Sequence, residues 1–246
     1  MVTEDVKPGS PDPISLTEPP ALIVHDLTAS YDRAQVLHGL SFSVGRGEAV
    51  ALLGRNGAGK STCLKALMGL VRRTGRIVAD GADLSRFDTP RIARAGLGYV
   101  PEERRIFAEL TVMENLEVGR RAARPGFTPW TTERLFDLFP NLARMRDRPG
   151  GRMSGGEQQM LALARTLIGN PSTLLLDEPS EGLSPLLVEE LAGVLFSLRR
   201  EGLSLLLSEQ NFRFAEFLCT RCYVLARGSF VFSGGFSDLH VPVLGI

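Results

Sequence analysis

The chain has 246 residues, 43% of them hydrophobic, and its 28 basic and 28 acidic side chains cancel at neutral pH. This length fits one larger α/β domain, or a core that carries one inserted subdomain. The zero net charge gives no reason to expect nucleic acid or an anionic membrane surface as a partner. The sequence has no apolar run near the roughly 18 residues of a membrane span and no apolar signal-peptide core. We therefore expect a soluble, cytosolic protein whose membrane contacts come through a partner.

The first predicted element is a disordered lead over residues 1–20, which are rich in proline, acidic and small residues and bury little apolar surface. A single domain is expected over residues 21–246. The apolar runs Leu22–Val24 and Leu40–Val44 predict strands of an antiparallel piece laid against the core. Tyr31 lies between them in a polar loop, where its ring could stack on a flat purine or sit half-buried on the surface.

The stretch from Gly54 to Ser61 follows the apolar run 49–53 and leads into a helical pattern. Strand, glycine loop and helix in this order are the context of a phosphate-binding P-loop. The glycines let backbone N–H groups turn toward phosphate oxygens, and the start of the helix adds its positive dipole end. Lys60 would reach the β- and γ-phosphates, and the Ser61 hydroxyl would bind Mg²⁺. The predicted nucleotide-binding residues of this loop are Gly54, Arg55, Asn56, Gly57, Ala58, Gly59, Lys60, Ser61 and Thr62.

A mostly helical insertion is predicted over about residues 88–160, after a turn expected at Thr74-Gly75. The insertion is entered through a short strand, Leu97–Val100, that is followed by Glu102. Helical spacing after a threonine start predicts one of its helices from Thr131 to Phe139.

Ser154 and Glu157 stand three residues apart before a periodic apolar run, which predicts a capping box at the start of a helix. Gly155 and Gly156 lie in its first turn, where each glycine costs about 1 kcal/mol of helix propensity. We expect them to allow close approach of a ligand, with the helix N-terminus aimed at an anion.

The continuous apolar run 173–176 predicts a buried parallel strand that ends in Asp177 and Glu178. Because the carboxyl ends of strands line the ligand crevice of such sheets, Asp177 would hold the water shell of a Mg²⁺ ion that faces Ser61. Glu178 would polarise an attacking water.

The remainder predicts a helix over 186–200, a buried strand over 203–207 that leads to Gln210, a short helix through Phe214, and a terminal hairpin. Cys219 and Cys222 have the spacing of a zinc or redox pair, but no second pair or histidine lies near them in the sequence. We expect two semi-buried side chains at a helix-to-strand junction.

With these pieces in order, residues 21–235 resemble the ATP-binding subunit of ABC transporters. The segment 154–159, placed between a P-loop and Asp177-Glu178, is specific to that family. The resemblance implies an α/β fold: a P-loop NTPase core with a mainly parallel sheet, an antiparallel β subdomain and an inserted helical subdomain. It also implies that Ser154, Gly155, Gly156 and Glu157 cover the ATP held by another cassette, and that Tyr31 stacks on adenine.

The chain departs from the commonest cassette pattern at three positions. Glu102 replaces a glutamine, Ser184 replaces an aspartate, and Gln210 replaces the switch histidine. With the segments 99–102 and 209–211, these residues resemble the branched-chain amino-acid importer cassettes. Cassettes of urea or short-amide importers share much of the pattern and remain an alternative. A soluble ABC ATPase that acts on ribosomes or DNA is a more distant one, because such proteins usually have two cassettes, a coiled coil or a basic tail.

The resemblance implies the cofactors ATP and Mg²⁺ and a catalytic set of Lys60, Glu178 and Gln210. The metal ligands would be Ser61, Asp177 and, through water, Glu102. A neutral glutamine cannot supply the proton-shuttling character of histidine, so hydrolysis here could be slower or depend more on the partner chain. The implied partners are a second cassette, non-identical or a copy of this chain, integral membrane permease subunits and, indirectly, a substrate-binding protein. We expect no nucleic acid and a peripheral location on the cytoplasmic face of the membrane.

Overall fold

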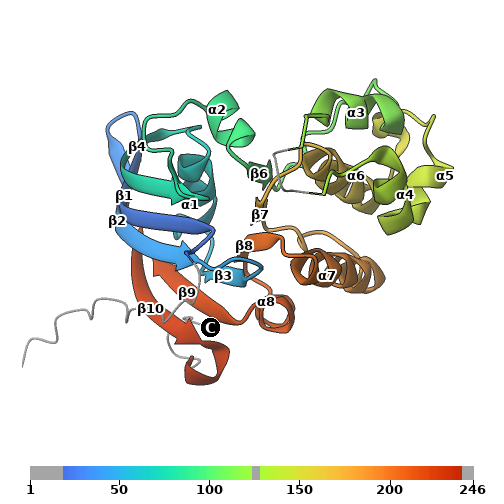
Figure 1. Cartoon of the computed structure of the whole chain (residues 1–246). Helices are drawn as coiled ribbons and strands as arrows, with labels where there is room; N and C mark the ends of the chain where they lie inside the picture. Colours follow the sequence, from blue (N-terminus) through green and yellow to red (C-terminus); the bar gives the residue numbers. More distant parts are fainter. Residues whose placement is uncertain (1–18, 124–127, 240–246) are drawn as a thin grey trace, which may run out of the picture.

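The computed structural model describes residues 19–123 and 128–239 of the chain (Figure 1). The predicted lead over residues 1–20 lies almost wholly outside this range. The described chain forms two β-sheets, with one helix between them and the others on the larger sheet and in a separate helical lobe (Figure 1). This is the predicted fold class.

The smaller sheet is antiparallel throughout, with strand order β2-β1-β4-β5. Its strands are β1 (Leu22–Tyr31), β2 (Ala34–Val44), β4 (Arg72–Ala79) and β5 (Ala82–Asp83). The predicted turn at Thr74-Gly75 is wrong, because both residues lie inside β4. Gly75 has a φ of +104°, and a Cβ there would lie 2.6 Å from the carbonyl oxygen of Asp26 on β1. This glycine therefore allows an irregular pairing of two strands to continue rather than ending one of them.

The larger sheet is parallel apart from its last strand, with order β10-β9-β3-β8-β7-β6. Its strands are β3 (Ala49–Leu53), β6 (Leu97–Val100), β7 (Thr173–Asp177), β8 (Ser204–Glu209), β9 (Arg221–Ala226) and β10 (Ser229–Gly235). Every residue of β3, β7 and β8 is buried, as expected for parallel strands that are covered on both faces. The predicted terminal hairpin is the antiparallel pair β9 and β10.

The helices of the described chain are α1 (Lys60–Leu67), α2 (Thr89–Arg94), α3 (Val112–Gly119), α4 (Thr132–Leu138), α5 (Pro140–Arg144), α6 (Gly155–Leu167), α7 (Pro185–Arg200) and α8 (Phe212–Leu218), with 3₁₀ turns at Gly150–Arg152 and Phe236–Asp238. The helices predicted after the P-loop, near Thr131, after Ser154, from Leu186 and through Phe214 begin close to those positions, whereas α2, α3 and α5 were not individually predicted. Proline stands at the first position of α5 and α7. A backbone N–H at this position would have no partner within the helix, so its absence in proline costs no hydrogen bond. None of the helices in residues 19–123 and 128–239 is long and apolar enough to cross a membrane.

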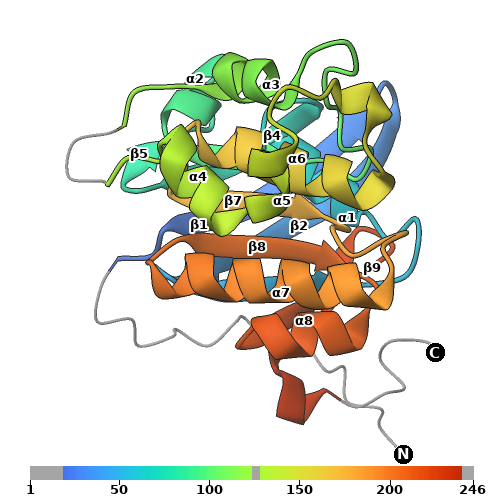
Figure 2. The ribbon, with the colours of Figure 1, turned by 90° about the vertical axis from the view of Figure 1, so that its right-hand side faces the viewer.

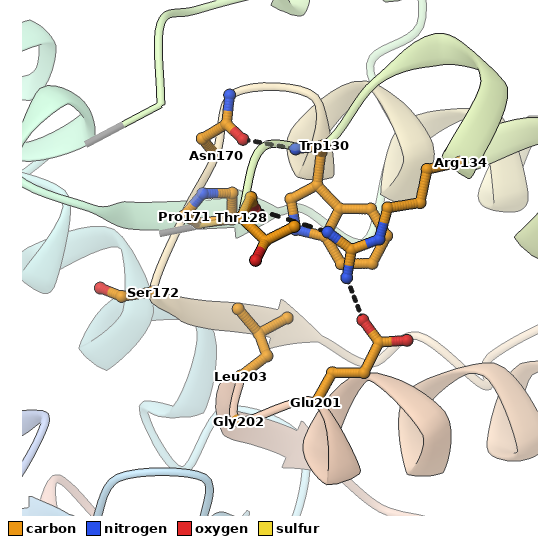
Figure 3. A pocket seen from close by; sticks show the side chains of 9 residues that line it. All are labelled: Thr128, Trp130, Arg134, Asn170, Pro171, Ser172, Glu201, Gly202 and Leu203. Atoms are coloured by element: carbon orange, nitrogen blue, oxygen red, sulfur yellow. Dashed lines mark hydrogen bonds and ion pairs between the residues drawn. The ribbon is translucent and has the colours of Figure 1, made fainter. Parts of the chain in front are cut away.

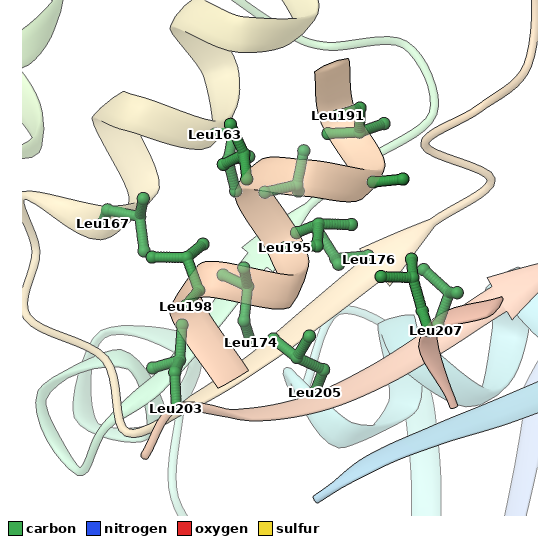
Figure 4. Packing of buried hydrophobic residues seen from close by; sticks show 14 of the residues in the cluster. Leu163, Leu167, Leu174, Leu176, Leu191, Leu195, Leu198, Leu203, Leu205 and Leu207 are labelled. Carbon is green, nitrogen blue, oxygen red and sulfur yellow. The ribbon is translucent and has the colours of Figure 1, made fainter. Parts of the chain in front are cut away.

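Two apolar clusters hold these layers together. In one, leucines of α6 and α7 pack on leucines of β7 and β8 (Figure 4), and Figure 2 shows α7 running alongside β8 with α8 next to it. In the other, α1 packs between the two sheets, with Cys63, Leu64 and Leu67 fully buried. The core therefore fixes the start of α1 against the carboxyl ends of β7 and β8, where the predicted site lies.

Helices α3, α4 and α5 stand with α6 in a lobe away from the antiparallel sheet (Figure 1). The capping boxes of α3 and α6 are complete: Thr111 with Glu114, and the predicted pair Ser154 with Glu157. The strand β6, which enters the predicted insertion, pairs in parallel with β7 and so belongs to the central sheet.

The three cysteines are free and buried. Cys219 directly follows α8 and Cys222 lies on β9, so the pair does occupy a helix-to-strand junction, although both side chains are buried rather than semi-buried. Burial raises the pKa of the Cys222 thiol to about 11. Within the described part of the chain, no group of three or more His, Cys, Asp or Glu side chains is arranged to hold a metal ion.

Candidate ATP-binding and hydrolysis site

The loop from Gly54 to Ser61 connects β3 to α1 and needs its glycines for both shape and space. Gly54, Gly57 and Gly59 have φ angles of +153°, +76° and +111°, which L side chains rarely adopt. A Cβ at Gly54 would also lie 2.4 Å from the carbonyl oxygen of Leu225. The loop can therefore curl its backbone N–H groups around an anion at the start of α1.

Lys60 is almost completely buried at this loop, with 4% of its surface exposed. Its Nζ donates hydrogen bonds to the carbonyl oxygens of Gly54, at 2.8 Å, and Arg55, at 3.3 Å. The same Nζ forms an ion pair with Oε1 of Glu178, at 3.0 Å. The ammonium group is thus held at the loop by the protein itself, where a phosphate would meet it.

Asp177 ends β7 and is 1% exposed. Its carboxylate accepts hydrogen bonds from the Ser61 hydroxyl, at 2.9 Å, and from the Tyr99 hydroxyl, at 3.0 Å. Burial raises the pKa of Asp177, and these hydrogen bonds offset only part of that effect. Ser61 and Asp177 form an oxygen donor set of the kind that Mg²⁺ prefers, with Glu102 the third predicted ligand nearby.

Glu178 occupies the left-handed region at φ +45°, which is uncommon for a residue with a side chain. Its backbone N–H donates to the carbonyl oxygen of Ser208 on β8, and its carboxylate accepts a hydrogen bond from the Gln210 amide. Burial acts to raise the pKa of Glu178, but the hydrogen bonds from Gln210 and Lys60 outweigh it and lower the pKa. The group is therefore an ionised carboxylate, able to orient a water molecule.

Glu209 is a third buried carboxylate beside Asp177 and Glu178, and it was not among the predicted site residues. It is 2% exposed, and it accepts hydrogen bonds from the backbone N–H groups of Ser180, Gln210 and Asn211, each at 3.1 Å. Burial raises its pKa. Glu209 ties the loop after Glu178 to the loop that carries Gln210. The signal was present, since an acid after an apolar strand is also the pattern that selected Asp177.

A cleft of about 470 Å³ opens beside these groups. It is lined by Val36, Asn56, Gly57, Gly59, Lys60, Ser61, Thr62, Glu102, Glu178 and Glu181. Val36 and Glu181 line the cleft but were not among the predicted site residues, and neither was Tyr99, whose hydroxyl donates to Asp177. Burial and the charges of Glu178 and Asp177 raise the pKa of Glu102. A hydrogen bond with Glu178 is the largest of the effects that raise the pKa of Glu181.

Tyr31 ends β1 and is 45% exposed, and it does not line this cleft. Its neighbours Asp32 and Arg33 form the turn to β2, so the residue stands at a strand end rather than inside a loop. Its stacking on adenine stays a prediction.

The residues Ser154, Gly155, Gly156 and Glu157 begin α6 and are absent from the lining of the cleft. A Cβ at Gly155 would lie 2.7 Å from Nη1 of Arg104, and a Cβ at Gly156 would lie 2.2 Å from Cδ1 of Leu187. Both glycines thus already admit side chains of the same chain, which the sequence did not reveal. The start of α6 does not face the P-loop cleft of the same chain, so an anion bound in that cleft would not be the one predicted at this helix start.

A separate cavity of about 410 Å³ lies where the helical lobe meets the core (Figure 3). There the Arg134 guanidinium lies 3.7 Å from the centre of the Trp130 ring and pairs with Glu201, and Asn170 accepts a hydrogen bond from the Trp130 backbone. These groups satisfy one another and form a brace between α4 and the end of α7.

The cleft combines what cleavage of a nucleoside triphosphate requires: backbone donors and a lysine for the phosphates, oxygen ligands for a hard cation, and an ionised carboxylate for water. The fold and site together define a P-loop nucleotide hydrolase. The sequence pattern of the ABC transporter family matches residues 37–181, more than half of the chain, and the chain belongs to that family. It is an ATP-hydrolysing subunit of an ABC transporter.

Subunits of two different transport systems are among the curated relatives. The chain is 42% identical to the high-affinity branched-chain amino acid transport ATP-binding protein BraG of Pseudomonas aeruginosa, over 82% of this chain and 87% of that protein. It is 37% identical to the lipopolysaccharide export system ATP-binding protein LptB of Haemophilus influenzae, over 87% of this chain and 90% of that protein. The chain is 34% identical to LptB of Escherichia coli, over 87% of this chain and 90% of that protein.

Solved structures agree with the fold. An ATP-binding subunit of an ABC transporter superposes with a TM-score of 0.77 at 31% identity, covering 89% of this chain and 91% of that one. A nucleotide-free ATP-binding cassette from an ABC transporter superposes with a TM-score of 0.76, covering 88% of this chain and 91% of that one. The two sequences are 23% identical, so this likeness concerns the fold alone.

Proposed function

We propose that this chain powers the import of branched-chain amino acids as one ATP-binding subunit of a membrane transporter. The observation that carries the proposal is the 42% identity to BraG, together with Glu102 and Gln210 at the positions where the importer cassettes depart from the commonest pattern. Lipopolysaccharide export is the second candidate, because two LptB proteins match over 87% of the chain at 37% and 34% identity.

The proposed chemistry is hydrolysis of ATP by positioning and charge stabilisation. The P-loop amides and Lys60 hold the phosphates, and Glu178 orients the attacking water. Gln210 donates to the Glu178 carboxylate and keeps it fixed and ionised. Ser61 and Asp177, with Glu102 through water, would hold Mg²⁺, which would neutralise charge that develops on the phosphates.

Lys60 and Glu178 form an ion pair with each other. A triphosphate in the cleft would give Lys60 a more strongly charged partner, and Glu178 would then be free to orient water.

The proposed partners follow from how ABC cassettes work, as dimers with membrane permease subunits. The second cassette would be this chain or a non-identical one, and it would supply its own Ser-Gly-Gly element across the cleft. The cassette pair would lie on the cytoplasmic face of the membrane, and a substrate-binding protein would act on it indirectly through the permease.

Reconstitution would test the proposed substrate. The cassette would be purified with the permease subunits encoded beside it, inserted into liposomes, and assayed for ATP hydrolysis with candidate cargoes. Branched-chain amino acids with their binding protein should stimulate hydrolysis, whereas lipopolysaccharide should not. Stimulation by lipopolysaccharide alone would replace import with export, and stimulation by urea or a short amide would move the chain to that importer group.

A further inference from the structure

Arg104 lies at the start of α6, although it belongs to the loop after β6, some fifty positions earlier in the chain. Its Nη1 would lie 2.7 Å, and its Cζ 3.3 Å, from a Cβ built on Gly155, the first residue of α6. Its Nη2 would lie 3.9 Å from a Cβ built on Gly182, in the loop before α7. The guanidinium group therefore stands between the helix that begins at Ser154 and the loop that follows Glu178.

The side chain of Arg104 has no partner among residues 19–123 and 128–239: no ion pair or side-chain hydrogen bond involves it, and its Nε is buried without an acceptor. A buried donor left unpaired lowers stability. The first turn of a helix favours anions over cations, and the carboxylate of Glu157 already occupies the N–H of Ser154 there. The neighbouring Arg105, in contrast, is paired with Glu103 on the surface.

The backbone holds Arg104 in this place. Arg104 and Arg105 have left-handed φ angles of +62° and +47°, a strained conformation for residues with side chains. Their carbonyl oxygens accept hydrogen bonds from Nη2 of Arg165, at 3.4 Å and 2.7 Å. Because Arg165 is on α6, these hydrogen bonds fasten the loop to that helix.

The guanidinium of Arg104 thus lies beside the N-terminus of α6, where Glu157 is the one acidic residue of the first turn and accepts from the Ser154 N–H. No carboxylate of the described residues pairs with Arg104, and residues 154–157 do not line the P-loop cleft of the same chain, so an anion from another molecule is the partner that this guanidinium fits. In the proposed function, each cassette places its Ser-Gly-Gly element across the cleft of the other, and the anion that reaches this point is then the terminal phosphate of ATP held by the other cassette.

We propose that Arg104 binds the γ-phosphate of ATP held in the P-loop of the partner cassette, in a pair formed by two copies of this chain. The proposal rests on the proposed function. A guanidinium group can donate two parallel hydrogen bonds to a phosphate, so Arg104 would distinguish ATP, which has a γ-phosphate, from ADP, which lacks it. Arg165 would act as a positioning residue for it.

Dimerisation of the Glu178→Gln chain gives the first test, because slow hydrolysis preserves the ATP-bound pair. Light scattering would measure the monomer–dimer dissociation constant with ATP and with ADP, in that background and with Arg104→Gln, Arg104→Lys or Arg105→Gln added. The symmetric pair has two such contacts, so their loss at roughly 10-fold each predicts roughly 100-fold weaker ATP-dependent dimers for Arg104→Gln. Arg104→Lys should recover part of the loss, and the matched control Arg105→Gln should behave as its parent.

A mixing experiment tests whether Arg104 acts across the pair. Arg104→Gln and Lys60→Ala, each with Glu178 intact, should hydrolyse ATP poorly alone. In a mixed pair, one site combines the intact P-loop of the first chain with the intact Arg104 of the second, so activity should rise on mixing. Nucleotide binding to monomeric Arg104→Gln, measured by titration with a fluorescent ATP analogue, should be unchanged, and its melting temperature should be no lower than that of Arg105→Gln, because Arg104 has no partner among the described residues to lose.

Each contrary result has a distinct meaning. If the Glu178→Gln parent forms no ATP-dependent dimer, the arrangement on which the proposal rests is wrong. If the parent dimerises and Arg104→Gln dimerises equally well, only the role of Arg104 is wrong. If hydrolysis by the pair is unaffected but transport with the membrane subunits is lost, Arg104 binds an acidic group of those subunits instead. Failure of mixing to raise activity would place Arg104 in its own chain's site.

Discussion

The starts of α1 and α6 both contain glycines, and a basic side chain lies beside each. The two basic side chains, Lys60 and Arg104, differ in whether the chain itself provides their partners. In the cleft, Lys60 is completely satisfied by two carbonyl oxygens and Glu178. At α6, Arg104 has no acceptor within the described residues. The lysine of the first helix start is therefore held by groups of its own chain, whereas the arginine of the second has none among the described residues. The two proposals above follow this difference: Lys60 would bind ATP within one chain, and Arg104 would contact ATP only in a pair.

The Glu178→Gln substitution should have the largest effect. The amide keeps the shape of the side chain but cannot accept a proton or bear charge, so hydrolysis should fall by roughly 10²- to 10⁴-fold. ATP should still bind, because Lys60 and the P-loop amides remain. Phosphate release and nucleotide titration would measure the two separately. Hydrolysis at the parent rate would show that another group orients the water, with Glu181, the neighbouring carboxyl in the cleft, the first to examine.

Substitution of Lys60 by alanine removes its hydrogen bonds to the P-loop carbonyl oxygens and its ion pair with Glu178. It removes a charged donor from the phosphates and should weaken ATP binding by roughly 10- to 100-fold, as loss of a charge-assisted hydrogen bond predicts. It also leaves the Glu178 carboxylate without its ion pair, which lowers stability in the absence of nucleotide. Titration with a fluorescent ATP analogue and thermal melting would measure both effects. The matched control is Lys65→Ala, which removes a lysine of the same helix that does not line the cleft; unchanged affinity in Lys60→Ala would contradict the P-loop assignment.

The Gln210→Ala substitution should act on rate with little effect on affinity. The Gln210 amide donates to Glu178 and does not line the cleft, so its loss frees the carboxylate to move without touching the phosphates. Removal of one hydrogen bond to a charged group predicts roughly a 10-fold slower hydrolysis. Steady-state kinetics would separate the maximal rate from the Michaelis constant. A raised Michaelis constant with an unchanged maximal rate would show that Gln210 binds nucleotide instead of holding Glu178.

The sequence was most informative where one local pattern dictates one structure. The P-loop, the strand ending in Asp177-Glu178 and the capping box of α6 could all be predicted, because glycine spacing, apolar runs and caps are local signals. The place of Gly75 inside a strand could not be predicted in this way. A sequence does not distinguish a glycine that ends a strand from one that leaves room for a neighbouring backbone. Likewise Arg104 beside Gly155 joins distant segments, and only the fold brings them together.

The smallest predicted effect concerns Glu102, the carboxylate that stands in the cleft where most cassettes have glutamine. Glu102→Gln removes a negative charge beside the phosphates without changing the shape of the side chain. Because Glu102 is an exposed residue, we expect affinity for ATP without Mg²⁺ to rise only about 2- to 5-fold, in the range of exposed charge pairs. The matched control is Glu103→Gln, which removes the same charge from the next residue, outside the cleft lining.

The pH dependence of ATP binding separates this charge effect from a structural one. Glu102 already has a raised pKa, and a bound triphosphate raises it further by like-charge repulsion. Binding is then linked to proton uptake, so affinity of the parent chain should increase as pH falls through the bound-state pKa and level off below the free-state pKa. The phosphates of ATP titrate equally in both proteins, so the difference between the parent and Glu102→Gln curves isolates Glu102. Parallel curves would mean that Glu102 stays ionised and far from the phosphates, and that this position serves contacts outside the cleft.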